Sequence, residues 1–187
     1  PPHGLQDDDE KLDPAGAHDE PFGDSSAIPT FRVAQLAARE VGRRYDALVW
    51  GSVATGQGVI DAPIGRHPTH RTRMAVVARG KPAITHYEIV QRGAGTTLLR
   101  CRLETGRTHQ VRVHLSSIGH SLLGDSLYGR ANSRVRDVLQ RLGFRRQALH
   151  AAVLGFVHPV TGDRLRFTSD LPADMKELID ETGHSNR

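Results

Sequence analysis

The sequence has a single cysteine, Cys101, among its 187 residues. One cysteine excludes an intrachain disulfide and a cysteine-rich zinc site, and its place in the apolar run 96–103 predicts a small buried side chain rather than a reactive thiol. No apolar run approaches the ~20 residues that cross a bilayer, and the amino terminus has no basic-then-apolar signal segment. We therefore expect a cytoplasmic protein that does not associate with membranes.

What the sequence does contain is an uneven distribution of charge. The first 25 residues hold eight acidic residues and one lysine, so the remaining 162 carry 13 acidic and 24 basic residues, a net charge of +11. Such an excess attracts polyanions, although an ordinary solvated arginine-rich surface is the simpler alternative. Residues 1–26, rich in Asp, Pro and Gly, predict a flexible acidic arm, which is either a solvated tail or a cover for the basic part of the chain.

Hydrophobic periodicity predicts one α+β domain over residues 27–187, built on a mostly antiparallel mixed sheet with flanking helices. A hydrophobic content of 37% and a mean hydropathy of −0.43 suit a soluble domain of this length with a sizeable core. The expected strands are 45–50, 56–61, 73–78, 83–90, 96–103, 148–158 and 164–168. The expected helices are 30–40, one that follows Gly106, 135–142 and 173–181.

The most informative segment runs from Leu103 to His114 and is followed by Gly124–Gly129. It places two arginines, two histidines, a threonine and a glutamine within eight residues at the end of an apolar strand. The expected helix has one apolar face, formed by Val111, Leu115 and Ile118. Arg112 lies beside that face, so its stem can be buried while its guanidinium reaches a cleft at the end of the strand.

This segment resembles the RluA-type pseudouridine synthases, most closely their large-subunit ribosomal RNA branch. The resemblance extends from about residue 27 to 178 and rests on four further blocks in the same order: Arg43–Val49, Pro63–Pro68, Gly80–Tyr87 and Ala148–Ala151. It implies a pseudouridine synthase-like catalytic domain that lacks part of its N-terminal half. It also implies an isomerase that converts uridine to pseudouridine in 23S ribosomal RNA, without a metal or redox cofactor.

By this resemblance, Arg112 is the partner of a nucleophilic aspartate and Tyr45 stacks against the target base. A cation near a carboxylate keeps it ionised, and a bidentate arginine does so with fixed geometry. An aromatic ring offers a stacking surface that tolerates any base. The alternative roles are a structural ion pair for Arg112 and a place in the core for Tyr45.

The family's His-Arg-Leu-Asp segment, which carries the nucleophile, is not intact in this chain. The nearest candidate is Asp13, which keeps only the Leu-Asp pair, and residues 17–24 cannot supply the apolar strand that normally follows. The nucleophile is therefore either Asp13 or an aspartate that this chain lacks. Asp125 is a weaker candidate, because the family's Gly-Asp at this point has a structural role in a turn.

Two groups of residues are candidates for binding RNA. Arg107, Thr108, His109 and Gln110 are expected to begin the helix, where free backbone N–H groups favour phosphates, although His109 and Gln110 can instead satisfy backbone groups. A basic strip with two prolines suits an RNA backbone and consists of Arg66, His67, His70, Arg71, Arg73 and Lys81.

The eleven histidines raise the question of a metal site. His67 and His70 are three residues apart, but no His-Glu-x-x-His motif or cysteine partner accompanies them, so we expect no metal. Two function classes remain in competition. One is a monomeric enzyme that acts on ribosomal RNA or pre-ribosomal particles, and a variant of this hypothesis is that the chain is a fragment of such an enzyme. The other is a catalytically degenerate synthase-like protein that binds RNA in ribosome assembly.

Overall fold

The computed structural model describes residues 42–129, 133–158 and 160–184. The predicted arm 1–26, the predicted helix 30–40 and the candidate nucleophile Asp13 lie outside these residues. No helix in the described ranges is long and apolar enough to cross a membrane.

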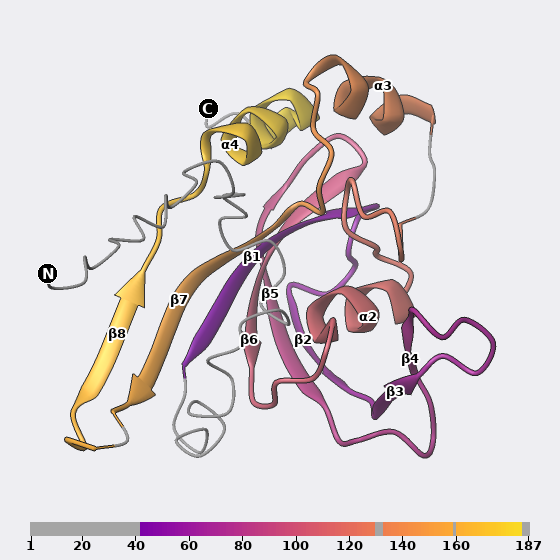
Figure 1. Cartoon of the computed structure of the whole chain (residues 1–187). Coiled ribbons are helices and arrows are strands. Elements are labelled where there is room, and N and C mark those ends of the chain that lie inside the picture. Colours follow the sequence, from indigo (N-terminus) through magenta and orange to yellow (C-terminus); the bar gives the residue numbers. More distant parts are fainter. Residues whose placement is uncertain (1–41, 130–132, 159, 185–187) are drawn as a thin grey trace, which may run out of the picture.

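Six strands form one antiparallel sheet in the order β2-β5-β6-β1-β7-β8 (Figure 1). Their bounds are β1 Arg43–Trp50, β2 Gln57–Asp61, β5 Ile84–Arg92, β6 Thr96–Leu103, β7 Leu149–Val157 and β8 Arg164–Thr168. Strand β1 pairs with β6 on one side and with β7 on the other. The first described strand therefore lies in the middle of the sheet, where both of its faces can be covered.

A second, two-stranded sheet consists of β3 (Ile64–Arg66) and β4 (Met74–Val76). We call residues 64–76 the basic hairpin, because its connecting loop carries most of the predicted basic strip. The sequence predicted β4 but not β3, since a strand of three residues next to Pro63 is too short to show an alternating pattern. All seven predicted strands are present, which confirms the α+β class and the antiparallel sheet.

Three α-helices lie in the described chain: α2 (Gln110–Ser117), α3 (Ser133–Arg141) and α4 (Ala173–Ile179). Helix α4 continues into a short π-helical turn, η1 (Asp180–His184), in which Gly183 leaves the helical conformation with a φ of 83°. Ile118, predicted on the apolar face of α2, instead follows the last helical residue and is 40% exposed. The apolar stripe is therefore shorter than the sequence indicated.

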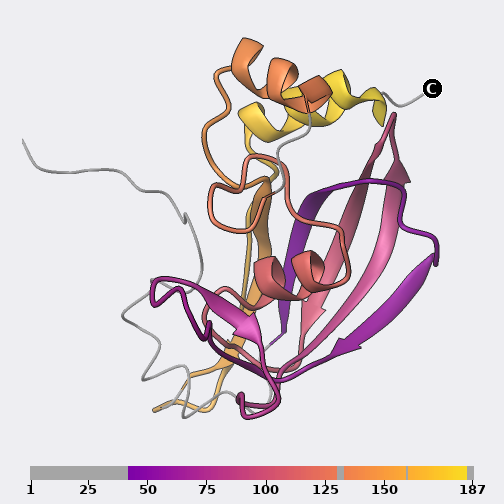
Figure 2. The ribbon, with the colours of Figure 1, turned by 90° about the vertical axis from the view of Figure 1, so that its right-hand side faces the viewer.

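Different helices pack against different parts of the sheet: α2 lies beside the middle of the strands, whereas α3 and α4 lie together at one end of the sheet (Figure 2). Because side chains alternate along a strand, Tyr45, Ala47 and Val49 of β1 face α2, whereas Leu48 faces the other way. On the α2 side the buried cluster also includes Leu99, Cys101, Leu103, Val111 and Leu115. On the opposite side Leu48 and Leu98 pack with Phe144 and with Met175 and Leu178 of α4.

Cys101 is fully buried in the first of these clusters. Burial, with a contribution from the negative charge of Asp46, raises the pKa of its thiol to about 12. Since the thiolate is the reactive form, Cys101 contributes to packing and not to chemistry.

Candidate active site

Helix α2 begins one turn later than the sequence indicated. Residues Arg107, Thr108 and His109 form the turn before it, and only Gln110 of the predicted group is helical. His109 has a φ of 57° and a ψ of 22°, a left-handed conformation that is uncommon for residues other than glycine. The Gln110 side chain accounts for this turn, because its Oε1 accepts hydrogen bonds from the backbone N–H of Arg107 and from Thr105 Oγ1.

A buried polar network fixes α2 on the sheet. Gln110 Nε2 donates to Thr85 Oγ1 at 3.1 Å, and Thr85 Oγ1 lies 2.8 Å from His114 Nδ1. His114 Nε2 lies 2.9 Å from the carbonyl oxygen of Ala62, which can only accept, so Nε2 carries the proton and Nδ1 accepts from Thr85. Burial lowers the pKa of His114, against smaller opposing effects of Ala62 and Asp61. The neutral imidazole therefore ties α2 to β5 and to the end of β2.

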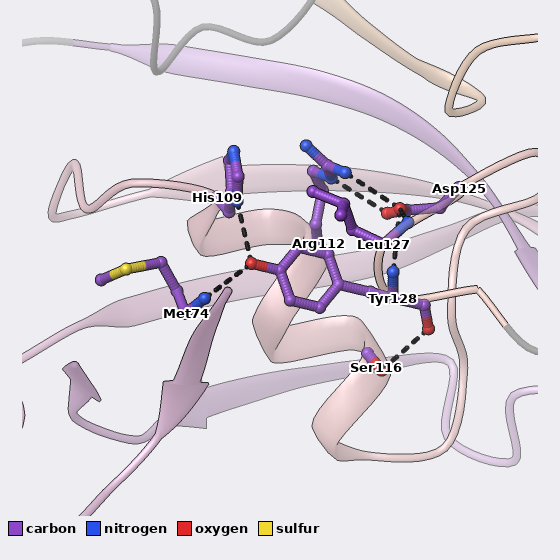
Figure 3. A network of polar contacts seen from close by, with 7 residues as sticks. All are labelled: Met74, His109, Arg112, Ser116, Asp125, Leu127 and Tyr128. Atoms are coloured by element: carbon purple, nitrogen blue, oxygen red, sulfur yellow. Dashed lines mark hydrogen bonds and ion pairs between the residues drawn. The ribbon is translucent and has the colours of Figure 1, made fainter. Parts of the chain in front are cut away.

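Arg112 and Asp125 form a bidentate ion pair beside this network (Figure 3). Arg112 donates from Nε to Oδ2 and from Nη2 to Oδ1, both at 2.9 Å, and the side chains are only 6% and 0% exposed. The backbone N–H groups of Leu127 and Tyr128 also donate to Oδ1. Burial raises the pKa of Asp125, but the bonds from Arg112, Tyr128 and Leu127 together hold it below its ordinary value.

Tyr128 lies against this ion pair and completes the network. The Arg112 guanidinium carbon stands 5.0 Å from the centre of its ring, within the range of a cation–π contact. Its hydroxyl accepts a hydrogen bond from the backbone N–H of Met74 at 2.9 Å and lies 2.8 Å from His109 Nδ1. Arg112 is therefore held on two sides by the loop 124–129 (Figure 3).

A cleft of about 510 Å³ opens where β1, α2 and the basic hairpin meet. Eight of the predicted site residues line it: Tyr45, Arg66, Lys81, Arg107, Thr108, His109, Gln110 and Arg112. His67, Arg71 and Arg73 belong to the basic hairpin but do not line the cleft, and Asp13 lies outside the described residues. Asp125 does not line it either, and both of its oxygens are engaged, so its contribution is to hold Arg112.

The cleft wall is cationic over an apolar floor. Five arginines and one lysine line it, and no Asp or Glu of the described ranges does. Tyr45, Leu103, Val111 and Leu149 supply apolar surface. A volume of this size lies within the range of pockets that hold small organic ligands, so the cleft can admit a nucleoside whose phosphates meet the basic wall.

Two of these cations, Arg43 and Arg79, were not among the predicted site residues. The alternation of side chains along a strand could have identified Arg43 as a cleft residue. Arg43 lies two residues before Tyr45 on the same strand, so the two side chains are on the same face. Arg79 lies in the turn before Lys81, where no periodicity indicates the direction of a side chain.

A larger hollow of about 1260 Å³ lies on the opposite face of the sheet and is lined in part by Arg44, Arg100 and Arg102. It contains neither Tyr45 nor Arg112, and Glu88 and His86 share its wall. The smaller cleft is therefore the candidate site. The described part of the chain holds no group of three or more His, Cys, Asp or Glu residues that could bind a metal ion.

Comparison with known proteins identifies the family. The model of the RNA pseudouridylate synthase family matches residues 30–117. "Ribosomal large subunit pseudouridine synthase D" of Zymomonas mobilis is 51% identical over 156 residues, which cover 82% of this chain and 49% of that protein. The protein of the same name in Nitrosomonas europaea is 55% identical over 147 residues, which cover 78% of this chain and 42% of that protein. The chain thus spans about half the length of these curated relatives.

Solved structures give the same result for the fold. Human RNA Pseudouridylate Synthase Domain Containing 1 superposes with a TM-score of 0.62 at 29% identity, covering 76% of this chain and 59% of that one. Human RNA Pseudouridylate Synthase Domain Containing 4 has a TM-score of 0.57 at 24% identity, covering 82% and 64%, and shares the fold. By its sequence and its fold, this chain belongs to the RNA pseudouridylate synthase family.

Proposed function

We propose that this protein is an RNA pseudouridine synthase that acts on uridine in large-subunit ribosomal RNA. The names of the two bacterial relatives support the substrate, and the family model supports the reaction. In this isomerisation the bond from ribose C1′ to uracil N1 breaks and C1′ bonds to C5, while C5 loses a proton and N1 gains one. Atoms and electrons balance within the nucleotide, so the reaction needs no cofactor.

The observation that carries the proposal is the rigidly held guanidinium of Arg112 in the wall of a cleft that also contains Tyr45. Asp125 engages Nε and Nη2, and the remaining guanidinium nitrogen points away from Asp125 (Figure 3). Arginine offers donors on all three nitrogens, so one guanidinium can serve two carboxylates. In our proposal Arg112 keeps the nucleophilic aspartate ionised, and Tyr45, 5% exposed, stacks on the flipped base.

The nucleophile itself is a separate part of the proposal. No carboxylate of the described residues lines the cleft, so the aspartate must enter from elsewhere. Asp13 is the candidate that this chain offers, and it precedes Tyr45 by about the interval that the family resemblance implies. Substitution Asp13→Ala tests this assignment and replaces no residue of the described cleft wall.

The RNA path is proposed along the cationic side of the cleft. Arg66, Lys81 and Arg107 lie in its wall, and His67, Arg71 and Arg73 extend the positive surface along the basic hairpin. Thr108 and His109 stand at the turn before α2, where they shape the mouth of the cleft. Gln110 is 3% exposed and positions this turn. We further propose a cytoplasmic monomer whose partner is 23S ribosomal RNA, alone or within pre-ribosomal particles.

Release of tritium from C5-labelled uridine in a large-subunit RNA transcript tests the function directly. We expect release by the wild-type protein, and a loss of about 100-fold or more in Arg112→Ala, since removal of one preorganised charge from an active site has an effect of that order. Arg146→Ala is the matched control, because Arg146 forms the same kind of ion pair away from the cleft. Absence of release by the wild-type protein would overturn the proposal.

The absence of a carboxylate from the described cleft wall favours a second candidate, a synthase-like protein that binds RNA without modifying it. The same transcript separates the two functions. Tight, salt-dependent binding without tritium release supports the binding protein, whereas release that Asp13→Ala abolishes supports the enzyme and identifies its nucleophile.

A further inference from the structure

We propose that Tyr128 is a positioning residue that couples the basic hairpin to the wall of the candidate active site, so that the RNA contacts of the hairpin depend on its hydroxyl. The inference rests on the proposed RNA-binding function of the cleft and adds to it a residue that neither touches the cleft nor belongs to the predicted site.

The contacts of Tyr128 reach three separate parts of the molecule. The hydroxyl accepts from the backbone N–H of Met74, the first residue of β4, across 54 positions of sequence. The same oxygen lies 2.8 Å from Nδ1 of His109, whose ring meets the Tyr128 ring edge-on with centroids 5.6 Å apart. The ring itself lies under Arg112. One side chain thus joins the hairpin, the turn before α2 and the cleft arginine (Figure 3).

Met74 lies at a position from which its hydrogen bond to Tyr128 can orient the basic hairpin. Met74 pairs with Arg66 in the hairpin, and the loop between them carries His67, Arg71 and Arg73. A strand pair of three residues is marginal by itself, because each strand contributes few ladder hydrogen bonds. Anchoring the Met74 amide on Tyr128 therefore fixes the direction in which the basic loop leaves the cleft.

The backbone of His109 supports the same interpretation. A non-glycine residue in the left-handed region is conformationally costly and persists only where its surroundings hold it. The Tyr128 hydroxyl supplies one such restraint, and the main chain of Tyr128 is itself fixed by Asp125 Oδ1 and by Ser116 Oγ. A change at the hydroxyl is consequently transmitted to the cleft wall as well as to the hairpin.

Tyr128→Phe separates the hydroxyl from the ring, since phenylalanine retains the surface under Arg112. The matched control is Tyr87→Phe, which removes a hydroxyl that bonds to Thr55 Oγ1 at 3.0 Å and does not line the cleft. In amide hydrogen exchange of the full chain, we expect Tyr128→Phe to accelerate exchange of Met74 and of the hairpin amides, and Tyr87→Phe to leave them unchanged. Unchanged hairpin exchange in Tyr128→Phe overturns the coupling, whatever the enzyme's activity.

A double-mutant cycle with RNA distinguishes coupling from a merely structural role. Arg71→Ala removes a cation from the tip of the hairpin, and we expect it and Tyr128→Phe each to weaken binding of the transcript about fivefold, the effect of about 1 kcal/mol. The combined variant should lose clearly less binding affinity than the product of the two single effects.

If the losses of binding free energy in the two single variants add up in the combined variant, the coupling is contradicted, because the hydroxyl and the hairpin cation then act independently. Failure of the proposed function has a different signature, namely a wild-type protein that releases no tritium or binds no RNA. Since the exchange experiment needs neither RNA nor turnover, it tests Tyr128 in either case.

Discussion

Two arginine–aspartate pairs of this molecule have the same geometry in opposite surroundings. Arg112 with Asp125 and Arg146 with Asp174 each form bonds from Nε and Nη2 to the two carboxylate oxygens, all at 2.9 Å. Each guanidinium also lies over an aromatic ring, Tyr128 at 5.0 Å in one case and Phe144 at 5.1 Å in the other. The side chains of the first pair are 6% and 0% exposed, and those of the second are 37% and 48% exposed.

The difference teaches that burial, rather than hydrogen-bond geometry, decides what such a pair does. For Asp125, burial is the leading effect on the pKa and opposes ionisation, but hydrogen bonds outweigh it. For Asp174, the hydrogen bond from Arg146 is the leading effect and lowers the pKa, and burial opposes it only as the second effect. A buried pair is costly to assemble and far costlier to break, because the remaining charge cannot return to water. The exposed pair links the segment before β7 to the first turn of α4, and solvent can replace it.

The largest expected effect comes from removing one carboxylate of each pair. Asp125→Ala leaves the Arg112 charge buried and also removes the acceptor for two backbone N–H groups, so we expect a loss of about 3–5 kcal/mol in the free energy of unfolding. Asp174→Ala should lose no more than about 1 kcal/mol, because its partner is solvated. Urea denaturation measures both values, and equal losses would contradict the role given to burial.

A smaller effect is expected from replacing the guanidinium group with an ammonium group, which keeps the positive charge. Arg112→Lys cannot bond both oxygens of Asp125 or lie flat on the Tyr128 ring, so we expect a loss of about 1.5–3 kcal/mol in the free energy of unfolding. The corresponding change Arg146→Lys should stay within about 1 kcal/mol. Thermal denaturation compares the two, and tritium release should fall in Arg112→Lys alone.

The pH dependence of stability should also differ between the buried and the exposed ion pair. The folded-state pKa of Asp125 lies below the ordinary value of 3.8, so the unfolded chain takes up the proton first as the pH falls. The stabilising effect of ionised Asp125 is complete at pH values above the ordinary pKa of 3.8, and it is lost as the pH drops through the folded-state pKa. Asp125→Asn should flatten this acid limb of stability against pH more than Asp174→Asn does, because solvent screens the exposed pair. A larger flattening in Asp174→Asn would contradict this expectation.

The smallest expected effect is that of salt on the coupling energy of the two ion pairs. Raising the ionic strength to about 1 M shortens the screening length to about 3 Å, which weakens exposed ion pairs and hardly affects buried ones. In a double-mutant cycle, the coupling of Arg146 with Asp174 should therefore fall with added NaCl, while that of Arg112 with Asp125 should remain. A salt-sensitive Arg112–Asp125 coupling indicates that water enters the candidate site.

Much of the fold was predictable because periodicity reports which way a side chain faces. The run 96–103 was predicted as a strand with the observed bounds of β6, and Tyr45 lies on β1 with its ring toward α2. The expectation that Arg112 has a buried stem beside an apolar helix face agrees with its position. The short β3 and the later start of α2 at Gln110 were missed, since a three-residue strand and a side-chain hydrogen bond leave no periodic pattern.

By itself, the sequence indicated the family through its resemblance in several blocks. It also determined the antiparallel sheet and the cations near one helix, because these follow from local pattern. Only the tertiary structure decided that Asp125 holds Arg112 and that Tyr128 reaches the Met74 amide. Those partners lie 13 and 54 positions apart and meet through loops, whose courses depend on how the whole chain packs. Periodicity identifies the face on which a residue lies, whereas packing selects the partner that it meets there.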